Sequence, residues 1–345
     1  MKKKSMSLYL PLILFLMMFS TSFSRIIYIP NEYGTIQEGI NESVHGDTVL
    51  VEQGTYFENI TFSGKAITVA SGYIFQQNSS IIENTIINGS EDNVICFEEN
   101  EDSLSVLCGF SIVNGSTGIL CVDGSSPKII DNFVFNNGAS GIVCNVATSP
   151  IILRNNIYDN SFNGVYCDNN STAEIRENTI YGNNYPNIWC GNGSDAIITD
   201  NFISCDQAAN NGIYINNSSV LISNNSISNC GYPAIYIENS TGSVISGNDI
   251  FDHESNGIVI FTSTISISNN LISNCGYPGI YCGDNSIGNI VNNIVDESMW
   301  GMYIENQTNV NIIGNIVSNS PKDGIAIINS NPYLINNTIV NNGLD

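Results

Sequence analysis

A short motif recurs about every 23 residues through most of the chain. Each copy places an aliphatic residue, a variable residue and then an Ile or Cys in a row, usually after a glycine, as in residues 141–144 (GIVC). The copies end at positions 121, 144, 167, 190, 215, 237, 260, 282, 304 and 327. A constant period of roughly 20 to 50 residues is typical of solenoids, in which each repeat packs only against its neighbours. We therefore expect one elongated repeat domain.

A second pattern, Asn followed by any residue and an aliphatic, runs in phase with the first. It occurs at Asn132, Asn155, Asn178, Asn201, Asn225, Asn248, Asn270, Asn292 and Asn337, and Gly314 takes its place once. Between these turn-forming residues lie short apolar runs with the alternation of β-strands, and no repeat has a helical period. Three short strands in about 23 residues make one coil of a parallel β-helix, and we predict about twelve coils. Equivalent residues then stack at ~4.8 Å intervals, so the Asn residues should form a structural ladder.

The beginning of the regular chain resembles a known superfamily. Residues 35–40 (TIQEGI), 46–51 (GDTVLV) and 54–60 (GTYFENI) are similar to the opening of pectin methylesterases and of other secreted β-helix proteins. With its repeats, the chain resembles the right-handed parallel β-helix superfamily, which has the pectate-lyase-like fold. The resemblance implies an all-β, single-stranded right-handed parallel β-helix with an N-terminal capping helix. The buried side of that helix is predicted to carry Ile36, Ile40 and Val44.

Three segments follow from these patterns. Residues 1–24 combine three lysines, an apolar run of about a dozen residues and small residues before the expected cleavage point, which is the pattern of a signal peptide. Residues 25–92 are predicted to form the N-terminal cap and first coils, and residues 93–345 the regular coils. No capping element follows the last repeat, so we expect a partner or a further segment to cover that end. The chain is expected to be secreted or at the cell surface, without membrane insertion after cleavage.

The charge balance excludes several classes of ligand. With 9 Lys and Arg against 32 Asp and Glu, the formal net charge is −23. Nucleic-acid-binding proteins need clustered basic residues to neutralise phosphates, so this composition excludes that class. Anionic sugars such as pectate or alginate would also be repelled, which makes a neutral extracellular glycan the better expectation.

The residue between the two inward positions of each repeat is predicted to point outward. Six of these outward residues are aromatic and form the candidate ligand-binding strip, which Val259 interrupts: Tyr166, Trp189, Tyr214, Tyr236, Tyr281 and Tyr303. Exposed aromatic rings bind the flat apolar faces of sugars. The structural interpretation is that Tyr favours strands and that stacked rings stiffen a sheet. A second aromatic set, which precedes proline, is interpreted as a turn device: Tyr185, Tyr232 and Tyr277.

Asp284 and Glu305 lie beside Tyr281 and Tyr303 in neighbouring coils and are the candidate catalytic residues. Carboxyl groups one coil apart could lie ~5 to 6 Å from each other, near the separation found in retaining glycosidases. The same pair could instead hold Ca²⁺ through its oxygens, and no other cofactor is expected. The Gly-His-Gly, Asp-Asp and Arg-Ile-Lys motifs of polygalacturonases are absent.

Cysteine is common and mostly falls at the inward end of the repeat motif. The predicted inward cysteines are Cys96, Cys121, Cys144, Cys167, Cys190 and Cys282. We expect buried thiols there, because in-register side chains point the same way and cannot easily reach disulfide geometry. A separate column, Cys230, His253 and Cys275, could bind zinc, although the simpler interpretation is a packed turn because no fourth ligand is present.

Three functions fit these features. The leading hypothesis is a non-catalytic secreted or cell-surface protein that binds extracellular glycan through the aromatic strip. The first alternative is a polysaccharide-active enzyme, such as a glycoside hydrolase, lyase or epimerase, with the same fold. The second alternative is a structural stalk of a surface protein.

Overall fold

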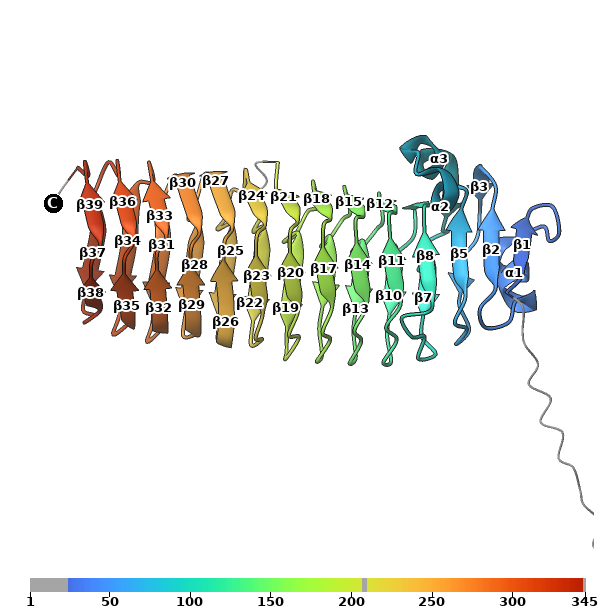
Figure 1. The fold of residues 1–345 in the computed structure, drawn as a ribbon, viewed down its shortest axis with the longest axis horizontal. Coiled ribbons are helices and arrows are strands. Elements are labelled where there is room, and N and C mark those ends of the chain that lie inside the picture. The colour runs from blue at the N-terminus through green and yellow to red at the C-terminus, as the bar shows by residue number, and fades with distance from the viewer. Residues whose placement is uncertain (1–23, 207–209, 344–345) are drawn as a thin grey trace, which may run out of the picture.

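The chain forms one right-handed parallel β-helix in the computed structural model, which describes residues 24–206 and 210–343 (Figure 1). Nearly all of the predicted signal peptide therefore lies outside the described residues. The strands join three long sheets of 14, 13 and 12 strands, and neighbouring strands are parallel throughout. The longest sheet implies about fourteen coils, more than the twelve predicted, because the less regular segment before residue 93 also contributes strands.

Sheet 1 contains, in spatial order, β1 (Ile26–Ile29), β2 (Thr48–Val51), β5 (Thr68–Ser71), β8 (Val106–Cys108), β11 (Lys128–Ile130), β14 (Ile151–Leu153), β17 (Glu174–Arg176), β20 (Ile197–Thr199), β23 (Leu221–Ser223), β26 (Thr241–Ser246), β29 (Thr264–Ser268), β32 (Ile287–Val291), β35 (Asn309–Ile313) and β38 (Tyr333–Ile335). Sheet 2 contains β3 (Gly54–Tyr56), β6 (Thr85–Asn88), β9 (Ser111–Val113), β12 (Phe133–Phe135), β15 (Asn156–Tyr158), β18 (Thr179–Tyr181), β21 (Phe202–Ser204), β24 (Ser226–Ser228), β27 (Asp249–His253), β30 (Leu271–Cys275), β33 (Ile294–Asp296), β36 (Ile316–Ser318) and β39 (Thr338–Val340). Sheet 3 contains β4 (Ile60–Thr61), β7 (Ile95–Phe97), β10 (Ile119–Cys121), β13 (Ile142–Cys144), β16 (Val165–Cys167), β19 (Ile188–Gly191), β22 (Ile213–Asn216), β25 (Ile235–Glu238), β28 (Ile258–Phe261), β31 (Pro278–Gly283), β34 (Trp300–Glu305) and β37 (Ile325–Ile328).

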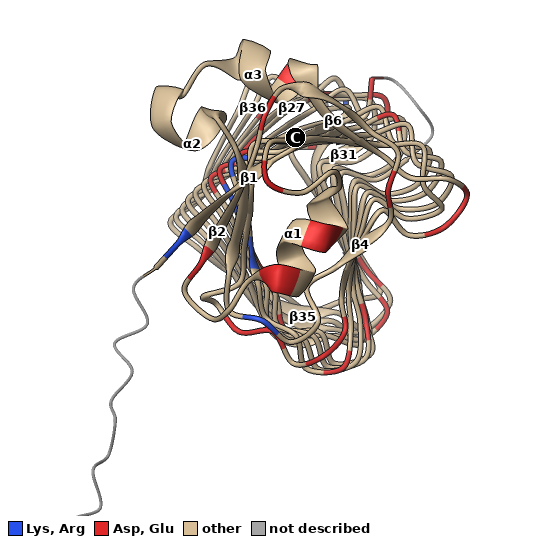
Figure 2. Cartoon of the chain, turned by 90° about the vertical axis from the view of Figure 1, so that its right-hand side faces the viewer, with Lys and Arg blue, Asp and Glu red and all other residues tan. Residues whose placement is uncertain are grey.

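A short helix, α1 (Ile36–Glu42), lies across the N-terminal opening of the coils (Figure 2). Thr35 begins it with a capping box, and Ile36 and Ile40 are fully buried. The predicted capping helix is therefore present. Val44 was predicted on its buried side, but the helix ends at Glu42 and Val44 is 56% exposed. Two other short helices, α2 (Tyr73–Gln76) and α3 (Ser79–Asn84), form an excursion outside the coils (Figure 1).

The interior is a stack of aliphatic side chains and free thiols. Cys121, Cys144, Cys167 and Cys190 are fully buried in four successive strands of sheet 3, and none forms a disulfide. Cys96 was predicted to point inward with them. In the less regular first coils, however, it is Phe97 that pairs with Cys121, so Cys96 lies on the other face of its strand and is partly exposed.

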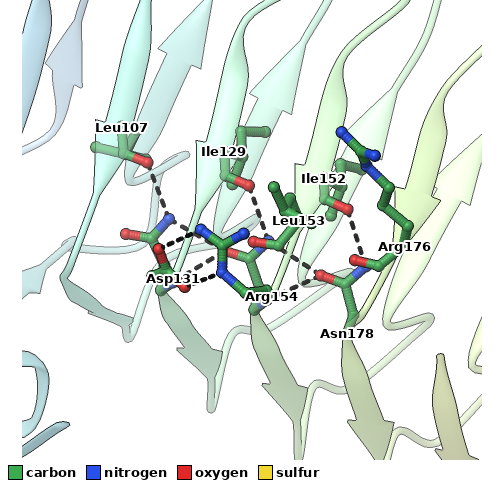
Figure 3. Close-up of polar contacts among 10 residues, drawn as sticks. Leu107, Ile129, Asp131, Ile152, Leu153, Arg154, Arg176 and Asn178 are labelled. Carbon is green, nitrogen blue, oxygen red and sulfur yellow. Dashed lines mark hydrogen bonds and ion pairs between the residues drawn. The ribbon is translucent and has the colours of Figure 1, made fainter. Parts of the chain in front are cut away.

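The turn between sheets 1 and 2 carries the predicted Asn ladder (Figure 3). In each turn, a residue with positive φ, such as Arg154, precedes an Asn, which is buried in every coil of the ladder before the last described one. Asn155 shows the pattern: its Nδ2 donates to the carbonyl of Ile129 (2.9 Å), and its backbone N–H donates to Oδ1 of Asn178 (2.9 Å). The complete ladder is Asn132, Asn155, Asn178, Asn201, Asn225, Asn248, Asn270, Asn293, Asn315 and Asn337.

Two ladder positions differ from the prediction. Asn292 and Gly314 occupy the positive-φ position, and the buried amides belong to the next residues, Asn293 and Asn315. Asn tolerates positive φ and Gly has no steric penalty there, so both positions of this turn select similar residues. The ladder is therefore continuous.

The final described coil leaves apolar side chains exposed. Ile327, Ile328, Leu334, Ile339 and Val340 are each 41% exposed. Among the described residues, no helix is both long and apolar enough to cross a membrane.

Candidate functional site

The six predicted strip residues stand at equivalent positions on the outer face of sheet 3. The register pairs Tyr166 with Trp189, Trp189 with Tyr214, Tyr214 with Tyr236, and Tyr281 with Tyr303. Each alternates with fully buried neighbours in its strand, because successive side chains of a strand point to opposite faces. All six are partly exposed. Their role in ligand binding remains a prediction.

The rings in this row stack in pairs. Tyr166 and Trp189 have ring centroids 4.5 Å apart and planes 5° from parallel, and the Tyr214–Tyr236 pair is similar at 5.1 Å and 5°. Offset stacking between parallel strands stabilises such pairs and also aligns them into one surface.

The first hollow above this row has a volume of about 750 Å³. Tyr166, Trp189 and Tyr214 line its floor. The turns that precede the strands of sheet 3 supply three more lining rings, and these are exposed: Phe162 (46%), Tyr185 (51%) and Tyr232 (54%). We call this hollow groove 1.

The pre-proline tyrosines were interpreted as a turn device. In the structure they also line the hollows above the strip. Tyr185 stacks on Phe162, with centroids 4.9 Å apart and planes 6° from parallel, so the two rings form a wall of groove 1. The Tyr-Pro sequence was visible beforehand. It was not predicted from the sequence that a turn tyrosine such as Tyr185 would line the same hollow as the strip residue four positions later, Trp189.

The polar lining of groove 1 consists of amides. Asn163, Asn184, Asn210 and Asn211 line it, and among the described lining residues none is charged. Asn163 donates through Nδ2 to the carbonyl of Pro186 (2.7 Å), and Asn211 donates to that of Pro233 (2.9 Å). With the amide nitrogens used in this way, the amide oxygens remain as acceptors for donors on a ligand.

A second hollow lies further along the same sheet and has a volume of about 320 Å³. It is lined by Tyr277, Pro278, Tyr281, Trp300, Tyr303, Glu305 and Asn256, and we call it groove 2. Tyr277 is 56% exposed, and Lys322 places its ammonium 3.9 Å from the centre of the Trp300 ring. Lys322 belongs to the next coil, and this cation–π contact stabilises the position of the Trp300 indole.

The coil between the two grooves differs from its neighbours. Val259 takes the strip position and is only 4% exposed. Phe261, two residues later, partly fills the gap. Its ring centroid lies 5.8 Å from that of Tyr236 and 5.2 Å from that of Tyr281. Sequence reasoning missed Phe261 because it stands two residues outside the repeat column.

Carboxylates beside the strip accept hydrogen bonds from the tyrosines. Tyr214 donates to Glu238 Oε1 (2.5 Å), Tyr166 donates to Asp168 Oδ2 (3.1 Å), and Tyr281 donates to Glu305. Burial, reinforced by these carboxylates, raises the pKa of Tyr166 and Tyr214 to about 12. The phenols therefore stay protonated and keep their orientation.

The two predicted catalytic carboxylates occupy different positions in their repeats. Glu305 directly follows Ile304, which pairs with Cys282, whereas Asp284 lies two residues after Cys282. Glu305 lines groove 2 and binds Tyr281, while Asp284 is exposed and accepts a hydrogen bond from Asn306 Nδ2 (3.0 Å). A catalytic or calcium-binding role for this pair remains a prediction.

In the structure, Cys230 and His253 of the Cys230–His253–Cys275 column have other partners, and a zinc-binding role for this column remains a prediction. Cys230 forms a disulfide with Cys205, so it offers no free thiolate. His253 is 3% exposed, its Nδ1 accepts from the backbone N–H of Cys230 (3.2 Å), and its Nε2 lies 3.1 Å from the carbonyl of Ile227. Within the described residues, no group of three or more His, Cys, Asp or Glu side chains is placed to hold a metal ion.

Comparison with protein families agrees with this geometry. The family described as the right handed beta helix region matches residues 26–203, 163–302 and 203–344. The chain belongs to this β-helix family. A search of curated proteins finds no match. The likeness of the N-terminal segment to pectin methylesterases remains a sequence-based expectation.

Solved structures share the fold of this β-helix at low sequence identity. The catalytic unit of the GH87 alpha-1,3-glucanase from Streptomyces thermodiastaticus has a TM-score of 0.69 and 14% identity, over 90% of this chain and 65% of that one. The mannuronan C-5 epimerase AlgE6 A-module from Azotobacter vinelandii has a TM-score of 0.51 and 12% identity, over 90% and 93%. The periplasmic alginate epimerase AlgG has a TM-score of 0.54 and 13% identity, over 91% and 83%. This β-helix thus spans about two thirds of the glucanase catalytic unit.

Proposed function

We propose that this β-helix protein is an extracellular or cell-surface protein that binds a neutral glycan in groove 1. The observation that carries the proposal is the combination of a stacked aromatic floor with an exposed aromatic wall around about 750 Å³. Sugar rings present flat apolar faces edged by hydroxyl groups. The aromatic rings match the faces, and the amide oxygens match the hydroxyl donors.

Charge supports a neutral ligand. The chain has a net charge of −23, and groove 1 has no charged residue among its described lining. A uronic acid polymer would meet a repulsive field, and no basic side chain among the described lining of groove 1 offsets it. Structural neighbours include proteins named as an alpha-1,3-glucanase and as alginate epimerases. Of those two sugar classes, the charge favours the neutral glucan.

The test measures binding of the chain from residue 25 onward to neutral glucans and to alginate. We expect binding to a neutral glucan only. Trp189→Ala and Tyr185→Ala should each weaken it about tenfold or more, which corresponds to about 1.4 kcal/mol. Tyr158→Ala is the matched control, because Tyr158 lies in a similar aromatic stack on sheet 2, 5.0 Å from Tyr181. Binding that survives both groove variants, or that Tyr158→Ala weakens equally, would contradict the proposal.

The extracellular location has its own test. Expression of the complete chain in a secreting host, followed by sequencing of the mature N-terminus, should give a protein that begins at Arg25. A chain that retains Met1 inside the cell would rule out the export signal.

A polysaccharide hydrolase is the second candidate, because Glu305 lines groove 2 and two of the structural neighbours are named as alpha-1,3-glucanases. In that case neutral glucans should release new reducing ends, and Glu305→Gln or Asp284→Asn should abolish this release. Glu238→Gln is the control, since Glu238 binds Tyr214 in the same manner but lies outside both grooves. If the wild-type protein releases no reducing ends, the binding role remains.

A further inference from the structure

Grooves 1 and 2 have the same construction. In both, a strip residue of sheet 3 and a pre-proline tyrosine from the preceding turn line the same hollow: Trp189 with Tyr185 in groove 1, and Tyr281 with Tyr277 in groove 2. The exposures of the two wall tyrosines are nearly equal, at 51% and 56%. The construction of groove 1 is thus repeated further along the molecule.

The coil between the two grooves has no aromatic residue at either the floor position or the wall position. The backbone N–H of Tyr277 donates to the carbonyl of Ser255 (3.3 Å), which places Ser255 at the wall position one coil earlier. Val259 takes the floor position of that same coil and is buried. Phe261 does not restore the platform, because its ring is tilted 47° from Tyr236 and 54° from Tyr281. The strip is therefore divided into two sites.

The grooves lie in line along the helix axis. The register leads from Trp189 through Tyr214, Tyr236 and Val259 to Tyr281, which is four steps. At ~4.8 Å per step, the two floors are about 19 Å apart. One straight ligand laid along the axis can therefore contact both floors, whereas a fragment of one to three sugars is too short to fill both grooves.

Groove 2 adds a charged acceptor to the same aromatic surface. Glu305 lines it and accepts the hydroxyl hydrogen of Tyr281. Its carboxylate retains lone pairs for a ligand hydroxyl and repels a ligand carboxylate. Groove 2 is therefore suited to the same neutral, hydroxyl-rich ligand as groove 1.

We infer that the two grooves are separate subsites that together hold one extended neutral glycan polymer along sheet 3. This inference rests on the proposed glycan binding. Once one groove is filled, a continuous chain delivers its next segment to the other at a high effective concentration. The affinity for a polymer therefore exceeds the affinity for a fragment without any further type of contact.

The experiment compares a long and a short form of one sugar. Soluble mixed-linkage β-glucan and insoluble alpha-1,3-glucan are the polymers, and the corresponding trisaccharides are the short probes. Binding is measured for the wild type, Tyr185→Ala, Tyr277→Ala and the double variant, with Tyr158→Ala as control. We expect the wild type to bind one polymer at least ten times more tightly than its trisaccharide, as two linked contacts allow. Each single variant should lose most of that advantage, and the double variant should lose binding.

The outcomes separate the inference from the function on which it rests. If Tyr185→Ala abolishes binding and Tyr277→Ala changes nothing, groove 1 is the whole site; the inference fails and the proposed function stands. If the trisaccharide binds as tightly as the polymer, the inference fails in the same way. If the wild type binds neither glucan in either form, the proposed function fails and takes the inference with it. Circular dichroism of each variant checks that the coils remain folded.

Discussion

At the scale of single residues, His253 takes the role that Asn has elsewhere in the turn between sheets 2 and 3. Asn160 donates through Nδ2 to the carbonyl of Val134 (3.1 Å), and its Oδ1 accepts the backbone N–H of Asn137 (3.2 Å). The two ring nitrogens of His253 face the equivalent pair, the carbonyl of Ile227 and the N–H of Cys230. The imidazole must be neutral, with its proton on Nε2, because Nδ1 has to accept.

This role makes stability depend on pH. Burial lowers the pKa of His253 from 6.5 to about 4. Between these values the unfolded chain binds a proton that the folded chain excludes, so stability should fall as the pH falls from about 6.5 to about 4. The full loss is about 3 kcal/mol. His253→Asn keeps both hydrogen bonds and removes the proton. In urea denaturation, the wild type should therefore lose stability relative to this variant as the pH drops, and a pH-independent difference would refute the assignment.

The Asn ladder provides a second residue-scale prediction. Asn178 donates to the carbonyl of Ile152 (2.9 Å) and accepts the backbone N–H of Asn155 (2.9 Å), all in the interior. Asn178→Ala removes both of these buried hydrogen bonds, so it should cost about 2–4 kcal/mol of unfolding free energy. Asn184→Ala, on the surface, should cost about 0.5 kcal/mol or less. Equal effects of the two substitutions in thermal melts would contradict a structural ladder.

At the scale of elements, the plug helix α1 depends on a lysine from outside it. Lys65 Nζ donates to the carbonyls of Ile40 (2.6 Å), Asn41 (2.8 Å) and Ser43 (3.0 Å). These groups belong to the last turn of the helix or follow it directly, where carbonyls have no partner within the helix and a positive charge is favourable. The lysine thus fastens α1 to the first coils.

Lys65→Met removes this cap while keeping the apolar stem. It should lower the unfolding free energy by about 1–2 kcal/mol. Lys128→Met is the control, because Lys128 lies on sheet 1 and its side chain forms no hydrogen bond or ion pair among the described residues. Chemical denaturation measures both, and similar midpoints for the two variants would show that α1 needs no such cap.

The repeat period predicted the sheets and the strip because it sets which residues become neighbours in space. It failed where a coil departs from the period. Cys205 lies in the coil between positions 190 and 215, which is two residues longer than most, so its pairing with Cys230 could not be predicted from a column. The N-terminal coils depart further, and there Cys96 was assigned to the wrong face. The grooves were not predicted because their lining comes from two different repeat positions, one in a turn and one in a strand of sheet 3. In the sequence, each repeat position was followed separately.

At the scale of the whole molecule, negative charge is spread over the turns that surround the coils (Figure 2). The net charge is −23, and the described residues contain only three ion pairs, Arg25–Glu32, Arg154–Asp131 and Arg176–Glu174. Repulsion among the acidic residues must therefore oppose the compact state. The acidic residues are unevenly distributed along the coils: six lie within residues 91–102, and the sequence from 210 to 237 contains none.

Added salt should consequently stabilise the protein. Between roughly 0.01 and 0.3 M NaCl the screening length falls below the spacing of most surface charges, so the melting temperature should rise. Calorimetry at neutral pH measures this, and an uncharged co-solute at the same osmolality serves as control. A melting temperature that falls with salt would mean that attractive pairs outweigh the repulsion.

The continuous ladder of buried amides has a consequence for how such a molecule can change. Every turn presents the same donor and acceptor to the turn after it. A whole repeat can therefore be gained or lost without leaving a hydrogen bond unmade at the new junction. Such an event would move the two aromatic hollows relative to each other by a single increment of ~4.8 Å. The amide column thus sets the unit, one coil, in which the distance between the two hollows can change.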